Sequence, residues 1–311
     1  MPVPNRSDAA ASRARLKARA FLHDLYGDFA VEDGRAGAVK LGAVVQLAAL
    51  LDVSEMAVRS AAARMVQDGW FSAERHKRES VYTLTERGRQ SLEERRERTF
   101  RPPDAWWNGR WCVVALSVPE SSRELRDRMR KTLAWLGFGS PSSALYVSAR
   151  DSRDAVLRSA EELGATGYLQ VYAAEEVWPL EPRDLVARAW LNLDEGNHRY
   201  AEFLAQFRPQ LARTRARMDA KALSDRAAFK LRIDLTAAFR RCLFDDPNLP
   251  LDLLPAKWNG LAARLLFREL YALVSPAALR YFDEVSAGTA EESAPAARTA
   301  RPRTRRAITA A

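Results

Sequence analysis

Hydrophobic positions recur at helical spacing in two short segments near the N-terminus. Residues 41–51 are apolar on nearly every side, which predicts a buried supporting helix. Residues 54–68 carry one apolar stripe, which predicts an amphipathic helix with a polar outer face. Ser54 is placed to cap the first turn of this second helix, and Gly69 is placed to end it. The pattern therefore predicts two helices joined by a tight corner at residues 52–53.

A hairpin pattern follows these helices. Apolar residues at 70–71 and alternating residues at 81–84 flank a charged stretch, which predicts a β-hairpin with a basic tip. A further helix is predicted over residues 13–26, where Gly27 is placed to end it. The order of helices followed by a hairpin is typical of a winged helix-turn-helix, a domain that binds DNA.

The outer face of the second helix is small and basic, so it can enter the major groove. Arg59 is the candidate for contact with a base edge, because a guanidinium can form two hydrogen bonds with a guanine. The candidates for phosphate or secondary base contacts are Ser54, Ser60 and Arg64, and those for contact of the hairpin with the DNA backbone are Arg75, Lys77 and Arg78. The alternatives are a surface helix with solvated arginines and, for Arg64, a salt bridge within the domain.

The remaining chain shows two further patterns. Residues 85–99 are heavily charged, which predicts a solvated linking helix that ends before Pro102. Strand and helix patterns alternate from residue 111 to residue 172, and the chain is helical after Pro182. We therefore expect an α+β protein with residues 1–12 disordered, 13–101 a winged helix domain with its linker helix, 102–180 a ferredoxin-like domain, 181–285 an all-α domain, and 286–311 a disordered basic tail.

Composition and charge favour a polyanionic partner. The net charge is +9 and the isoelectric point is about 9.8, with the positive charge concentrated in the two ends of the chain. No apolar run reaches the length of a membrane span, and the N-terminus lacks the apolar core of a signal peptide, so we expect a cytoplasmic protein without membrane contact. Cys112 and Cys242 lie far apart in apolar patterns, and we expect both to be buried thiols.

The sequence lacks the usual patterns of catalytic sites. The histidines lie on separate segments, with no paired-histidine helix motif, nucleophile elbow or Cys/His metal spacing. The glycine turn at residues 137–139 lacks the third glycine of a dinucleotide loop and the lysine of a P-loop. We therefore expect neither an enzyme nor a metal or cofactor site. The alternative from another class is a protein-interaction scaffold in which the basic domain docks an acidic protein.

The chain resembles the PaaX-type repressors of phenylacetic acid degradation, whose N-terminal domain is similar to GntR-type winged helices. The resemblance covers about residues 16–285, and the order and spacing of its motifs carry it. The motifs are YGDF at 26–29, VSEMAVR at 53–59, RMV at 64–66, DGW at 68–70, YTLT at 82–85 with Gly88, WNGRW at 107–111, LGFG at 136–139, DPNLP at 246–250 and LPAKWNG at 254–260.

This resemblance implies a fold and a function. It implies a winged helix, a middle domain similar to the ferredoxin-like subunit of CRISPR integration complexes, and a helical C-terminal domain. It also implies a homodimer on a palindromic operator that is released by a coenzyme A thioester, phenylacetyl-CoA in the best-known members. Relatives of the middle domain that cut nucleic acid use an aspartate at the end of the first strand, and residues 111–118 contain none. The chain departs from the family at Asp52 and Lys77, where glycine is usual, so a GntR-like regulator with an unrelated effector is an alternative.

The implied effector gives candidates for a second site. Coenzyme A carries an adenine ring and phosphates, so its site needs arginines beside an apolar or aromatic wall. Arg240, Arg241 and Trp258 supply these residue types on or near a segment that matches the family. The alternative is that one of the two arginines pairs with Asp245 or Asp246. Trp258 would then pack in the core.

Overall fold

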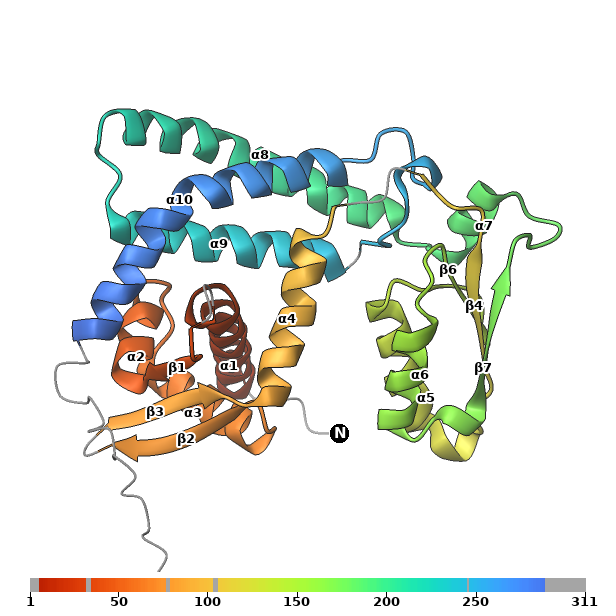
Figure 1. The fold of residues 1–311 in the computed structure, drawn as a ribbon, viewed down its shortest axis with the longest axis horizontal. Coiled ribbons are helices and arrows are strands. Elements are labelled where there is room, and N and C mark those ends of the chain that lie inside the picture. The colour runs from red at the N-terminus through yellow and green to blue at the C-terminus, as the bar shows by residue number, and fades with distance from the viewer. Residues whose placement is uncertain (1–5, 32–34, 77–78, 103–105, 245, 289–311) are drawn as a thin grey trace, which may run out of the picture.

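The computed structural model describes residues 6–31, 35–76, 79–102, 106–244 and 246–288 (Figure 1). Two antiparallel sheets and the surrounding helices make up this part of the chain, which confirms the predicted α+β class. Residues 6–12 and 286–288 are helical, whereas the sequence predicted disorder there. The N-terminal stretch is rich in alanine and arginine, which both favour helix. The rest of the predicted basic tail, residues 289–311, lies outside the described residues.

The first helix is longer than the sequence predicted. α1 (Arg6–Leu25) continues directly into a π-helical turn, η1 (Tyr26–Ala30). Gly27 therefore does not end the helix. All five residues of η1 are buried, so tertiary packing outweighs the low helix propensity of the glycine.

Two helices and a corner follow, as the hydrophobic pattern predicted. α2 (Leu41–Ala49) is largely buried, and α3 (Glu55–Gln67) buries one face. At the corner between them Asp52 has a φ of 55°. Aspartate enters this left-handed region more readily than most residues, and glycine does so without strain. The departure from the family glycine is therefore compatible with the same corner.

A small sheet lies beside these helices, at the end of the molecule opposite α8 (Leu193–Asp219; Figure 1). β2 (Phe71–His76) and β3 (Glu79–Leu84) form the predicted hairpin. β1 (Ala38–Lys40), which the sequence did not predict, pairs with β3, so the strand order is β1-β3-β2. β1 is too short to show an alternating pattern in the sequence.

A second unit follows the linking helix α4 (Glu86–Phe100). Its strands are arranged in the order β5-β6-β4-β7, and all neighbours are antiparallel. The sequence did not predict β5, whose Gly-Ser-Pro-Ser composition is unfavourable for a strand. The elements in chain order are β4 (Trp111–Leu116), α5 (Arg123–Trp135), β5 (Gly139–Ser142), β6 (Leu145–Ser148), α6 (Arg153–Leu163) and β7 (Leu169–Ala174).

The two faces of this second sheet bury different parts of the chain. Val114 and its neighbours on one face pack against α5 and α6. Trp111 and Val113 on the other face pack against α7 (Pro182–Ala189) and the segment 249–254. The middle unit is therefore attached to the C-terminal part of the chain through its sheet.

Long helices complete the C-terminal part. α8, α9 (Asp225–Phe244) and α10 (Gly260–Gly288) pack side by side (Figure 1). α10 is continuous through Pro276, although a proline inside a helix removes one backbone hydrogen bond. Val274 and Ala278 are buried on either side of the proline, so packing holds the helix through it.

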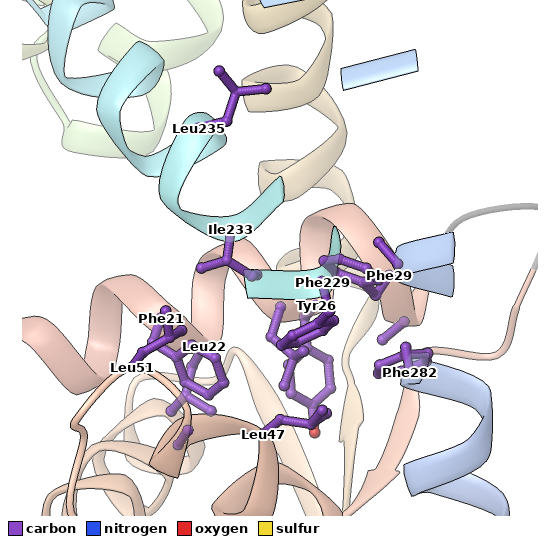
Figure 2. Close-up of a cluster of buried hydrophobic side chains, with 14 of the residues drawn as sticks. Phe21, Leu22, Tyr26, Phe29, Leu47, Leu51, Phe229, Ile233, Leu235 and Phe282 are labelled. Carbon is purple, nitrogen blue, oxygen red and sulfur yellow. The ribbon is translucent and has the colours of Figure 1, made fainter. Parts of the chain in front are cut away.

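One hydrophobic core joins the N-terminal unit to α9 and α10. The ring centroid of Phe29 lies 4.8 Å from that of Phe229 and 5.5 Å from that of Phe282. Figure 2 shows Ile233 of α9 facing Phe21 of α1. The sequence predicted a domain boundary near Pro102. This core, however, contains residues from both sides of that boundary.

A buried charge cluster crosses the same junction. Arg240 of α9 is 7% exposed and pairs with Asp24 of α1 and, at 2.9 Å, with Asp28 of η1. Burial opposes the charge on Arg240, but the two carboxylates outweigh it and raise the pKa of the guanidinium. Burial also raises the pKa of Asp24 to about 6, which Arg240 opposes. Beside them Arg232, which is 0% exposed, donates to the Asp28 carbonyl at 2.6 Å and to the Tyr271 hydroxyl.

This cluster generates a stability prediction. Arg240→Met should lower the free energy of unfolding by about 3–5 kcal/mol, because Asp24 and Asp28 would remain buried without their counter-ion. Arg241→Met, which changes an exposed side chain on the same helix, should change it by about 0.5 kcal/mol or less. Urea unfolding of the two variants measures both values. Equal losses for the two variants would contradict a stabilising role for the cluster.

Candidate nucleic-acid interface and effector pocket

α3 begins and ends where its sequence predicted. The Ser54 hydroxyl accepts a hydrogen bond from the Ala57 amide at 3.3 Å, which caps the first turn. Gly69, with a φ of 74°, follows the last turn. Val58 and Met65 are buried, so the opposite face of the helix is turned toward solvent.

Arg59 lies on this outer face, and its side chain is 58% exposed. It pairs with Glu55 one turn earlier at 2.7 Å. An exposed ion pair of this kind contributes about 0–1 kcal/mol. A bidentate contact with a guanine discriminates between bases by about 1–3 kcal/mol. The ion pair with Glu55 therefore does not prevent Arg59 from contacting a guanine instead.

The other candidates on α3 differ in exposure. Arg64 is exposed and forms no ion pair with any residue that the structure describes. The predicted alternative, a salt bridge within the domain, is therefore not observed among those residues. Ser60 is half-buried, and Ser54 is exposed although its hydroxyl caps the helix.

The hairpin lies next to α3 (Figure 1). Arg75 is exposed on β2, an edge strand of the sheet. Lys77 and Arg78, the predicted residues of the hairpin tip, lie outside the described residues. Among the described residues of the hairpin, Arg75 therefore adds a positive charge next to the outer face of α3.

Met56 is a surface residue that the sequence analysis missed. It lies on α3 between Glu55 and the first buried positions, and it is 81% exposed. Position 56 lies outside the apolar stripe of α3. An apolar residue outside that stripe was the feature of the sequence that could have identified Met56 as a surface residue. An exposed apolar side chain beside Arg59 is chemically suited to contact a thymine methyl group.

The structure brings together two of the three predicted effector residues. Arg240 and Arg241 both line a cavity of about 630 Å³ between α1, the corner at residues 51–53, α4, α8 and α9, which we call the turn pocket. Trp258 is not among the residues that line it. Its ring instead packs against Tyr200, with 5.7 Å between the ring centroids.

The sequence analysis offered an alternative in which Arg240 or Arg241 pairs with Asp245 or Asp246. This alternative was only partly correct. Arg240 is paired, but with Asp24 and Asp28 rather than with Asp246. Asp246 lies 3.6 Å from Arg264 and accepts a hydrogen bond from the Tyr200 hydroxyl. Asp245 lies outside the described residues. The sequence could not indicate which acidic residue would be close to Arg240, because its partners are more than 200 positions away.

Comparisons with known proteins decide the family. Family models described as PaaX-like protein, PaaX protein central Cas2-like domain and PaaX-like protein C-terminal domain match residues 17–88, 104–186 and 182–284. The transcriptional repressor PaaX of Escherichia coli is 30% identical over 278 residues, which cover 88% of this chain and 86% of that protein. The chain belongs to the PaaX family. The matched segments include both α3 and α9.

A solved structure supports the fold of this PaaX-family protein. The uncharacterized protein Rv0674 of Mycobacterium tuberculosis superposes with a TM-score of 0.50 at 19% identity. The match covers 88% of this chain and 98% of the other. At this identity the likeness concerns the fold alone.

Other chemistry is sparse in the part of this PaaX-family chain that the structure describes. That part holds no group of three His, Cys, Asp or Glu residues that could bind a metal ion. Cys112 and Cys242 are both free and buried, as predicted, and burial raises the pKa of the Cys242 thiol to about 11. Burial and the nearby Arg95 lower the pKa of His23 to about 3. No described helix has the length and apolar character needed to cross a membrane.

Proposed function

We propose that this PaaX-family protein is a DNA-binding transcriptional repressor and not an enzyme. The relative in Escherichia coli is named a transcriptional repressor, and the two chains match over most of their lengths. The observation that carries the proposal is the outer face of α3, where Arg59 is exposed at the centre of a small and basic surface. A helix of this kind, supported by a second helix and flanked by a hairpin, fits the major groove.

In this proposal residues 13–101 act as a winged helix-turn-helix. Arg59 contacts a guanine, and Met56 lies close to a thymine methyl group. The second set of contacts comes from Ser54, Ser60 and Arg64, and the hairpin follows the phosphates through Arg75, Lys77 and Arg78. The exposure of Arg59, Arg64 and Arg75 supports this assignment.

The finer part of the proposal comes from the family. We infer that the chain acts in the cytoplasm as a homodimer on a palindromic operator, with the middle unit as a ferredoxin-like domain. The operon it controls would belong to phenylacetate catabolism, and an acyl-CoA such as phenylacetyl-CoA would release it. The βαββαβ order of residues 111–174 supports the ferredoxin-like assignment.

A gel shift with DNA from upstream of the protein's own gene tests the function. A repressor gives a discrete shifted band that disappears when phenylacetyl-CoA is added. A nuclease gives cut DNA, and a protein-interaction scaffold gives no band that differs from that on random DNA. Either of the last two results would contradict the proposal.

Arg59→Ala should weaken operator binding by about 1–3 kcal/mol and relax base specificity, because the bidentate contact is lost. The matched control is Arg213→Ala, which removes an exposed arginine from α8. Binding titrations on operator and on random DNA measure both effects. Equal losses on the two DNAs for Arg59→Ala would remove Arg59 from base recognition.

Arg75→Ala should weaken binding to operator and to random DNA by similar factors, because a phosphate contact carries no base information. The slope of log affinity against log salt concentration should become shallower by about one. Titrations at several salt concentrations measure the slope. An unchanged slope would place Arg75 away from the phosphates.

A further inference from the structure

The ion pair between Glu55 and Arg59 lies on the outer face of α3, at the start of the helix. The Nε and Nη2 atoms of Arg59 each lie 2.7 Å from Oε1 of Glu55, so the carboxylate contacts one edge of the guanidinium. Other pairs at the same spacing lack this geometry. Arg101 of α4, for example, contacts Glu97 through Nη2 alone. The contact through two nitrogens restricts the orientation of the Arg59 guanidinium.

The guanidinium of Arg59 has a second edge that this contact leaves open. The N–H groups of a guanidinium form a rigid planar fork, and one edge of the fork consists of Nη1 and Nη2. Among the residues that the structure describes, none accepts a hydrogen bond from Nη1 of Arg59. N–H groups on this edge can reach O6 and N7 of a guanine. Arg59 can therefore contact a guanine while it stays paired with Glu55.

The pair also affects binding to phosphates. A phosphate attracts an arginine of any position through charge, and such contacts supply most of the affinity for DNA of random sequence. Glu55 lies within hydrogen-bond distance of Arg59, so the pair as a whole carries no net charge and attracts a phosphate only weakly. A guanine is neutral and is recognised through directional hydrogen bonds. The pair therefore favours contact of Arg59 with a base over contact with the DNA backbone.

An acidic residue in the first turn of a helix also stabilises the helix itself, because it interacts with the free N–H groups of that turn. α4 offers a position where this local effect occurs alone. Thr85 caps α4 through its hydroxyl, as Ser54 caps α3, and Glu86 follows as the first helical residue. Glu86 is exposed and forms no ion pair within the described part of the chain. Glu86 is therefore a matched control for Glu55.

We propose that Glu55 is a specificity-determining residue of the DNA-binding surface and that it acts through Arg59. It positions the guanidinium with its open edge toward a guanine, and it reduces the attraction of Arg59 to phosphates. The inference rests on the proposed repressor function. It goes beyond that function because it assigns part of the sequence selectivity to an acidic residue, which contributes no attraction to DNA.

Binding titrations of the full-length protein on DNA from upstream of its own gene and on a random-sequence duplex test the inference. The ratio of the two affinities measures the selectivity. Glu55→Ala should lower this ratio by about tenfold, because Arg59 is then free to bind a phosphate of any sequence. For the same reason, the slope of log affinity against log salt concentration on random DNA should become steeper by about one. Glu86→Ala should change neither quantity.

A double-mutant cycle separates the positioning of Arg59 from a local effect on the helix. In a protein that already carries Arg59→Ala, the further change Glu55→Ala should leave the ratio nearly unchanged, because its effect requires the arginine. A further tenfold loss in that background would overturn the inference. An unchanged ratio for Glu55→Ala alone, or an equal loss for Glu86→Ala, would also overturn it.

The wild type in the same titrations separates this inference from the proposed function. A wild type that binds both duplexes with equal affinity contradicts the repressor function and the inference together. A wild type that prefers the upstream DNA, combined with an unchanged ratio for Glu55→Ala, keeps the repressor function and overturns the role of Glu55 alone.

Discussion

The buried pairing of Arg240 with Asp24 and Asp28 is the interaction on which the rest of the structure depends. It links α9 to α1 and η1 at a place where all three side chains are shielded from water. Charges in such a place are tolerated only while each keeps its partner, because removal of one leaves an uncompensated charge. The same junction contains the aromatic contacts of Phe29. The N-terminal unit and the C-terminal helices are therefore held as one body.

This junction gives α9 a central position in the fold. On one side α9 packs against the unit that presents α3, and on another its Arg241 reaches the turn pocket. The middle unit is tied to the same body through Arg98 of α4, which donates to the Leu243 carbonyl at 2.6 Å and lies over the Trp135 ring.

Local patterns could be predicted from the sequence, and long-range pairings could not. The cap at Ser54 and the stop at Gly69 depend on their immediate neighbours, so the limits of α3 were predictable. The π-helical turn at Gly27 depends on the burial of η1 under α9 and α10, which no local pattern reveals. The partners of Arg240 lie more than 200 residues away along the chain, so the sequence offered only nearby aspartates. For the same reason the sequence could not indicate that Arg95 and Arg241 share a pocket.

Hydrogen exchange of the full-length protein, with and without upstream DNA, tests most directly whether the α3 surface binds the duplex. Amides of β2 and β3 and of the first turns of α3 should exchange more slowly when the DNA is bound, whereas those of α5 and α6 should not change. Slower exchange confined to the middle unit, with α3 unaffected, would contradict the central claim that this PaaX-family protein reads DNA through the outer face of α3.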